Sequence, residues 1–133
     1  MLILKNEHID AIICHAGEIY PHECCGIIAG KDARVESIIK IRNVVVSSVE
    51  YSMSTTELKG ALDELDSKGL EFIGVYHSHP TSVAYPSETD VINAAFPELD
   101  YIIVSLLDRD NPELKNFKMI DKKIQEEPFE VID

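Results

Sequence analysis

A nearly continuous apolar run from Tyr101 to Leu107 limits the folds that this chain can adopt. Such a run is typical of a strand covered on both faces, because a half-exposed strand alternates apolar and polar residues. A strand buried in this way needs other layers on both sides of its sheet. The run therefore predicts a layered α/β domain.

Hydrophobic spacing and turn residues predict the remaining elements. Apolar residues three and four apart predict helices over 6–20 and 55–68, and a hydroxyl cap at Ser87 predicts a short helix that includes Val91 to Phe96. We expect strands over 25–29, 35–46, 71–79 and 101–107, with the first two antiparallel neighbours and 71–79 in the middle of the sheet. Residues 114–120 and 129–132 are expected as edge strands. Together these elements predict one α/β sandwich domain over residues 1–133, with helices on both faces of a mixed sheet.

Composition narrows the class of protein. The 133 residues are 45% hydrophobic and 27% charged, which excludes a disordered chain, a collagen-like fibre and a coiled coil. The 12 basic and 24 acidic residues give a formal net charge of −12, which argues against nucleic acid and anionic membranes as partners. The opening MLILKNEHID is too short for a signal-peptide core, and no apolar run could span a bilayer. We therefore expect a cytoplasmic protein whose three cysteines are reduced.

The segment from His77 to Asp90 carries the strongest chemical signal. Two histidines two positions apart on a strand, His77 and His79, project from the same face. Asp90 lies in the first turn of the expected third helix, where the helix dipole favours a carboxylate. Two imidazoles and one carboxylate give Zn²⁺ three protein ligands and leave a fourth position for water, which is the coordination pattern of catalytic sites.

A catalytic zinc site also needs an acidic residue that takes a proton and is not a ligand. Glu23 is one candidate, because it lies beside an apolar strand where partial burial would raise its affinity for protons. Glu88 and Glu71 are alternatives that composition alone does not exclude. The Ser87 hydroxyl has two roles open to it, as a helix cap and as a hydrogen-bond donor to an oxyanion.

These residues resemble the JAMM metalloprotease domain, also called MPN-plus. That family has a glutamate near the N-terminus, then His-x-His-Pro, a spacer and Ser-x-x-Asp. The corresponding positions here are Glu23, His77, His79, Ser87 and Asp90, and Pro80 completes the His-x-His-Pro motif. The segment from Pro21 to Gly26 looks most like the short, free-standing prokaryotic members.

The resemblance implies a cytidine-deaminase-like α/β/α sandwich with a mixed β-sheet and one zinc ion per chain, held by His77, His79 and Asp90. It further implies that Glu23 acts as general base and then acid, and that Ser87 stabilises the oxyanion. The implied reaction is hydrolysis of a peptide or isopeptide bond after the C-terminal glycine of a ubiquitin-like or sulfur-carrier protein with a Gly-Gly tail. The −12 charge adds the hypothesis that this partner docks through basic residues near its tail.

Two other functions remain open at this point. Some members of the same superfamily are non-catalytic MPN scaffolds, but these usually lack a ligand, and here every ligand position is filled. A zinc deaminase needs His-x-Glu and a Pro-Cys-x-x-Cys pair, neither of which occurs. An exposed edge strand would also permit a homodimer.

Several other residues receive expectations from their position alone. We expect His8, His15 and His22 at helix surfaces or in loops, with His22 a candidate neighbour of the site. Cys24 is expected to face solvent beside the base, with no base of its own to make it a nucleophile, and Cys25 is expected in the core. The segment 51–53 is a candidate lining of a substrate groove, with Met53 expected to pack.

Overall fold

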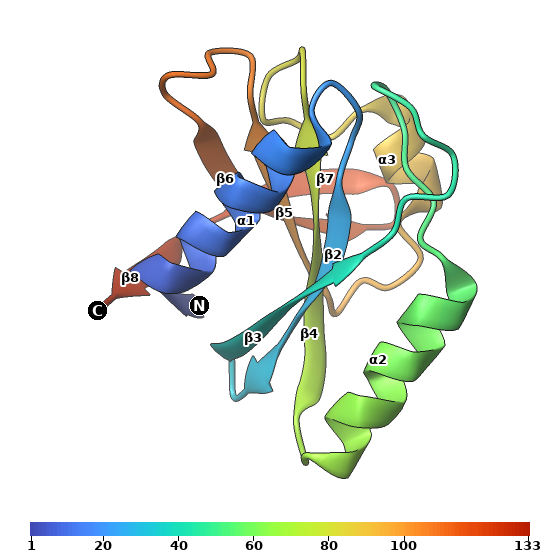
Figure 1. The fold of residues 1–133 in the computed structure, drawn as a ribbon. Helices are drawn as coiled ribbons and strands as arrows, with labels where there is room; N and C mark the ends of the chain where they lie inside the picture. Colours follow the sequence, from blue (N-terminus) through green and yellow to red (C-terminus); the bar gives the residue numbers. More distant parts are fainter.

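The computed structural model describes residues 1–133 and contains one sheet of eight strands, in the order β7-β6-β5-β4-β2-β3-β1-β8 (Figure 1). The strands are β1 (Leu2–Lys5), β2 (Cys25–Lys31), β3 (Arg34–Ile41), β4 (Glu71–His79), β5 (Asp100–Ser105), β6 (Glu113–Ile120), β7 (Lys123–Glu127) and β8 (Phe129–Ile132). The helices are α1 (Asn6–Ile19), α2 (Thr55–Ser67) and α3 (Glu88–Asn93). The sheet is mixed, because β4 pairs antiparallel with β2 and parallel with β5.

The sheet separates two hydrophobic cores. Helix α1 contributes Ile12 and Ala16 to the core on one face, and α2 contributes Ala61 and Leu65 to the core on the other. Alternate residues of β5 enter the two cores, which explains why its sequence is apolar throughout. The structure thus confirms the expected α/β sandwich with helices on both faces of a mixed sheet.

The ends of the helices follow from local hydrogen bonds. The Ser54 hydroxyl accepts a hydrogen bond from the Glu57 backbone N–H at the start of α2. Beyond the end of α2, Gly69 has a φ of 67°, which glycine adopts without the strain that a Cβ would cause. At the start of α1, the His8 Nδ1 accepts from the Lys5 backbone N–H at 3.0 Å.

The strand expected over 35–46 ends five residues early, at Ile41. The Asn43 side-chain oxygen accepts from the backbone N–H groups of Val45 and Ser52, so these groups are not available to a strand partner. Val46 then takes a positive φ of 41°. The β-branched composition of this segment predicted a strand, but the side-chain hydrogen bonds of Asn43 form a loop instead.

The prediction for residues 114–120 was right about the strand and wrong about its position. Strand β6 lies between β5 and β7 and is not an edge strand. A turn with positive φ at Asp121 and Lys122 folds the chain back into β7, which the sequence did not predict. Strand β8, expected at an edge, does end the sheet order.

Only Pro128 separates β7 from β8, although these two strands lie at opposite ends of the sheet order. The sheet must therefore curl strongly to bring its two ends together (Figure 1). The short strand β1, also not predicted, pairs parallel with both β8 and β3.

The remaining expectations differ from the structure in smaller ways. Helix α3 ends at Asn93 rather than near Phe96, and β5 ends at Ser105. All three cysteines are free thiols. None of the helices combines the length and apolar character that crossing a membrane requires.

Candidate functional site

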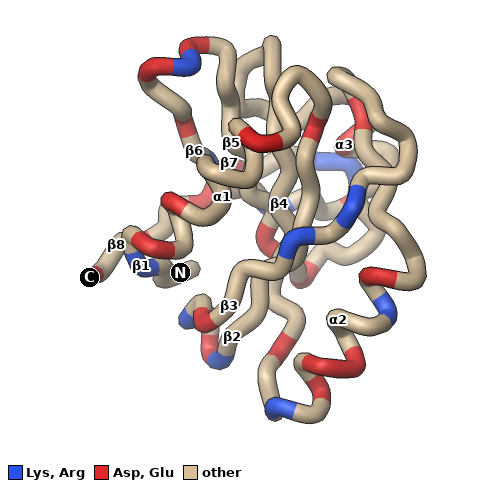
Figure 2. The backbone as a smooth tube through the Cα atoms, viewed as in Figure 1, with Lys and Arg blue, Asp and Glu red and all other residues tan.

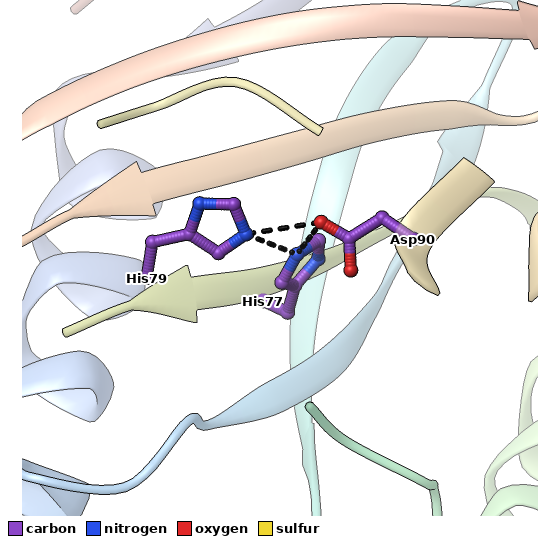
Figure 3. A group of neighbouring side chains, drawn as sticks. All are labelled: His77, His79 and Asp90. Atoms are coloured by element: carbon purple, nitrogen blue, oxygen red, sulfur yellow. Dashed lines mark hydrogen bonds and ion pairs between the residues drawn. The ribbon is translucent and has the colours of Figure 1, made fainter. Parts of the chain in front are cut away.

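The two histidines of the His-Ser-His-Pro sequence and Asp90 meet at one point in the structure (Figure 3). His77 and His79 come from the carboxyl end of β4, and Asp90 comes from the first turn of α3. The Asp90 Oδ2 lies 3.1 Å from the His77 Nε2 and 3.0 Å from the His79 Nε2. The two Nε2 atoms are 3.2 Å apart, and all three side chains are buried.

This triangle of atoms fits a tetrahedral zinc ion. Zinc bonds to imidazole nitrogen and carboxylate oxygen are about 2.0–2.2 Å long, so ligand atoms at the corners of a tetrahedron lie roughly 3.3–3.5 Å apart. The three separations here are 3.0–3.2 Å, slightly below that range. The side chains present could therefore hold a metal ion with only small adjustments and would supply three ligands.

Neighbouring groups orient the three candidate ligands. The His79 Nδ1 lies 2.8 Å from the Val83 carbonyl oxygen. A carbonyl oxygen can only accept, so Nδ1 carries a proton, and Nε2 can bind a metal in place of its hydrogen bond to Asp90. Asp90 and Ser87 form a reciprocal cap: the Ser87 N–H donates to Asp90 Oδ2 at 2.9 Å, and the Asp90 N–H donates to Ser87 Oγ at 3.1 Å.

His77 is held by packing. Its Nδ1 has no hydrogen-bond partner, and the ring of Tyr51 stacks on its imidazole with 4.6 Å between ring centroids. The sequence suggested that residues 51–53 line a groove but did not indicate this contact, because a single aromatic residue in a loop has no periodic pattern. Met53 packs against the core as expected.

The electrostatics of the triad formed by His77, His79 and Asp90 favour the ionised form of Asp90. Burial alone would raise the pKa of Asp90, but hydrogen bonds from His77 and His79 outweigh it and lower this pKa well below its usual range. Burial lowers the pKa of His77. Burial would also lower the pKa of His79, but its hydrogen bonds to Asp90 and the Val83 carbonyl raise it. Asp90 therefore stays ionised, as a metal ligand must.

Glu23 lies beside this triad. The antiparallel pairing of Cys25 with His77, continued by two residues beyond the start of β2, places Glu23 opposite His79. The Glu23 side chain is buried with 2% exposed, and its Oε1 has no hydrogen-bond partner. Burial raises the pKa of Glu23 from 4.5 to about 8. A buried carboxyl group with an unpaired oxygen beside the candidate ligands fits a group that exchanges protons with a small molecule.

The two alternative glutamates are placed differently. Glu71 lies at the other end of β4, where its Oε1 accepts from the Asp32 backbone N–H. Glu88 is the first residue of α3, and its side chain is exposed. Only Glu23 combines burial with a position opposite His79.

The hydroxyl of Ser87 keeps its proton available in the observed arrangement. As a helix cap, Ser87 Oγ uses a lone pair to accept from the Asp90 N–H. A hydroxyl has one proton and two lone pairs, so the same group can still donate one hydrogen bond. Capping and oxyanion donation, which the sequence left as two roles, are therefore compatible.

Three expectations about other residues are wrong. Cys24 is buried instead of facing solvent, and burial raises its thiol pKa to about 11, which makes it a poor nucleophile. His8 and His15 are buried instead of lying at the helix surface. His8 caps its helix, and the His15 Nδ1 lies 2.8 Å from the buried Tyr76 hydroxyl. The expectation for Cys25 is confirmed, since it lies in the core below α2.

Comparison with known proteins gives one family match and several relatives. Residues 5–120 match the family Prok-JAB, described as prokaryotic homologs of the JAB domain. A CysO-cysteine peptidase of Mycobacterium tuberculosis is 30% identical over 135 residues, which cover all of this chain and 92% of that protein. A desampylase of Haloferax volcanii is 38% identical over 111 residues, which cover 78% of this chain and 80% of that protein.

A solved structure matches the whole of this chain. The solution structure of a protein from Desulfitobacterium hafniense superimposes with a TM-score of 0.91 at 28% identity, covering all of this chain and 94% of that one. The fold described above, with its curled mixed sheet and helices on both faces, is therefore shared with a protein whose structure was determined experimentally.

Proposed function

The chain belongs to the prokaryotic homologs of the JAB domain, and from that premise we propose that it is a zinc-dependent hydrolase that cleaves after the C-terminal glycine of a ubiquitin-like or sulfur-carrier protein. The observation that carries the proposal is the placement of buried Glu23 opposite His79, beside a three-atom set that fits zinc. The names of two relatives, a CysO-cysteine peptidase and a desampylase, support the class of reaction.

The proposed chemistry divides between the metal and the side chains. When bound by His77, His79 and Asp90, zinc would act as a Lewis acid toward the scissile carbonyl and lower the pKa of water. Glu23 takes a proton from the attacking water at a carboxylate oxygen. The same proton then goes to the leaving amine as the carbon–nitrogen bond breaks, which returns Glu23 to its starting state.

We assign Ser87 the role of donor to the developing oxyanion. Its hydroxyl lies at the N-terminus of α3, two residues after Tyr85, and the proton that capping leaves unused can point toward the substrate. Ser87 also lines an open pocket of about 530 Å³, which we assign to the extended tail of the substrate. Its lining consists of Tyr85, Pro86, Ser87, Glu88, Val91, Ile92 and Ile124.

The charge of the protein supports a partner that is basic near its tail. Acidic residues occur on all three helices and in several turns, and the lysines and arginines are fewer and scattered (Figure 2). Attraction between such a surface and a basic one increases the rate of encounter and selects partners.

The experiment that tests the function uses the host's own ubiquitin-like carriers. Each carrier is prepared in three forms past its terminal Gly-Gly: as a cysteine adduct, as an extended precursor and as a lysine-linked conjugate. The zinc-loaded protein is added, and products are read by intact mass. We expect at least one form to lose its extension at the glycine. If all three forms remain intact with zinc fully bound, the non-catalytic scaffold becomes the better description.

A further inference from the structure

Two side chains hold the peptide group that joins Glu23 to Cys24. The Asn43 Nδ2 donates a hydrogen bond to the Glu23 carbonyl oxygen at 3.1 Å. The Ser78 Oγ accepts one from the Cys24 backbone N–H at 2.8 Å. The Glu23 backbone N–H donates to the Ser47 carbonyl at 2.7 Å, so the backbone groups on both sides of the Glu23 side chain are fixed.

Ser78 reaches this peptide from the strand that carries the candidate ligands. It lies between His77 and His79 on β4 and is fully buried, and its side chain points to the opposite face of the sheet. The Ser78 backbone N–H donates to the Cys24 carbonyl at 3.1 Å, as in a regular antiparallel pair. The second hydrogen bond of such a pair, donated by the Cys24 N–H, goes to the Ser78 hydroxyl rather than to the Ser78 carbonyl. The hydroxyl therefore ties the segment just before β2 to the strand that presents the histidines.

Asn43 reaches the same peptide from the loop after β3. Its Nδ2 also donates to the Glu50 carbonyl, and its Oδ1 accepts from the Val45 and Ser52 N–H groups. The amide thus joins the Glu23 segment to the loop over residues 43–53. That loop also provides the Tyr51 ring that stacks on His77, so one loop contacts both the segment of the base and a candidate ligand.

The side chain of Glu23 depends on this backbone support. Its Oε1 has no hydrogen-bond partner, so this oxygen does not anchor the carboxylate. A proton acceptor must stay within hydrogen-bond reach of the water that it activates, and a displacement of about 1 Å can lower the rate roughly a hundredfold. Fixing the peptide that follows Glu23 limits the positions that its side chain can occupy.

We propose that Asn43 and Ser78 are positioning residues that clamp the Glu23–Cys24 peptide and so hold the Glu23 carboxylate in place for proton transfer. This inference rests on the proposed hydrolase function. Neither residue contacts the candidate metal ligands through its side chain in the hydrogen bonds described above.

The test uses Ser78→Ala, which removes the acceptor, and Asn43→Asp, which removes the donor to Glu23 and keeps an acceptor for the loop. Matched controls are Ser67→Ala at the end of α2 and Asn111→Asp in an exposed turn. For each protein we measure kcat and KM on the cleaved carrier, zinc content, and hydrogen exchange of the Cys24 amide.

We expect each clamp variant to lower kcat by about ten- to a hundredfold with little change in KM or zinc content, and the controls to match the wild type. The Cys24 amide should exchange faster in Ser78→Ala whether or not metal is bound. Because both residues act on one peptide, the double variant should lose less than the product of the two single losses.

Three results would contradict the inference. One is an undiminished kcat in both variants although the Cys24 amide exchanges faster in Ser78→Ala. Another is a fall in kcat that only follows a fall in zinc content, which would make the two residues structural. Multiplicative losses in the double variant would also exclude a shared action. If the wild type cleaves no carrier, the proposed function fails and this inference fails with it, whereas an active wild type with fully active variants overturns this inference alone.

Discussion

The ring of Tyr51 stacks on the imidazole of His77 at an interplanar angle of 27°, with 4.6 Å between the ring centroids. His77 lacks the usual hydrogen bond from its second ring nitrogen, since its Nδ1 is buried without a partner. The aromatic contact thus takes over part of the orientation that a hydrogen bond commonly provides.

Replacing Tyr51 with alanine should weaken zinc binding. Loss of an outer contact to a metal ligand typically lowers metal affinity about ten- to a hundredfold, and we expect the lower end because a stacking contact is less directional than a hydrogen bond. Tyr51→Phe keeps the ring and should bind zinc as the wild type does. Competition with a chromogenic chelator measures both affinities. Equal affinity in the alanine variant would show that His77 is oriented without the ring.

Each of His77→Ala, His79→Ala and Asp90→Ala should lower zinc content. Their three ligand atoms form the only group of closely placed His, Cys, Asp and Glu side chains in the structure that could hold a metal. Elemental analysis of the purified proteins measures the effect, and Glu71→Ala is the control, because that residue lies at the far end of β4. Full zinc occupancy in all three variants would remove the proposed site.

The candidate site was predictable because the motif has a simple geometric meaning. His77 and His79 share a face of a strand, and Asp90 lies three residues after a capping serine, so the motif predicts three side chains that approach one point, as the structure places them. The contacts of Asn43, Tyr51 and Ser78 were not predictable. These contacts depend on a loop and on side chains from distant segments, and no periodic pattern in the sequence predicts them.

The fold was predictable for similar reasons. The prediction failed where local hydrogen bonds override the strand propensity of the residues. The predicted bounds of helices α1 and α2 and of strand β4 lie within two residues of the observed bounds, because the apolar residues of these elements recur regularly. Residues 42–46 have strand composition, but Asn43 diverts them into a loop. Strands β1 and β7 were not predicted, because β1 continues directly into α1 without a turn signal and β7 contains a single apolar residue, Ile124.

Glu23→Gln should keep zinc and the fold but lose turnover. Glutamine has nearly the same shape and does not accept a proton at neutral pH, so the loss isolates the proton transfer, which typically contributes about 10²–10⁴-fold to the rate. Cleavage of a carrier substrate followed by intact mass gives the rate, with Glu71→Gln as the matched control. A variant that cleaves at the wild-type rate would mean that another group accepts the proton.

Gly26→Ala should destabilise the protein. A Cβ at this position would overlap the ring of Tyr76, which is fully buried and hydrogen-bonded to His15. Overpacking of this kind typically costs about 1–3 kcal/mol. Gly60→Ala is the comparison, because a Cβ there meets nothing within 4 Å on helix α2 and should stabilise by roughly 0.5–1 kcal/mol. Urea denaturation measures both free energies of unfolding, and equal values for the two variants would contradict the packing argument.

The stability of the metal-free protein should depend on pH through Glu23. Burial raises the pKa of Glu23 from 4.5 to about 8 in the folded protein. Between these values the unfolded chain has released the proton while the folded protein still binds it, so the free energy of unfolding falls as the pH rises.

Glu23→Gln has no such proton and should lose this dependence. The histidines and Asp90 are common to both proteins, so their own contributions cancel to first order in the difference. Urea denaturation with chelator present, at several pH values within this interval, should show the variant gaining stability relative to the wild type as the pH increases. A constant difference would mean that Glu23 titrates in the folded protein as it does in the unfolded chain.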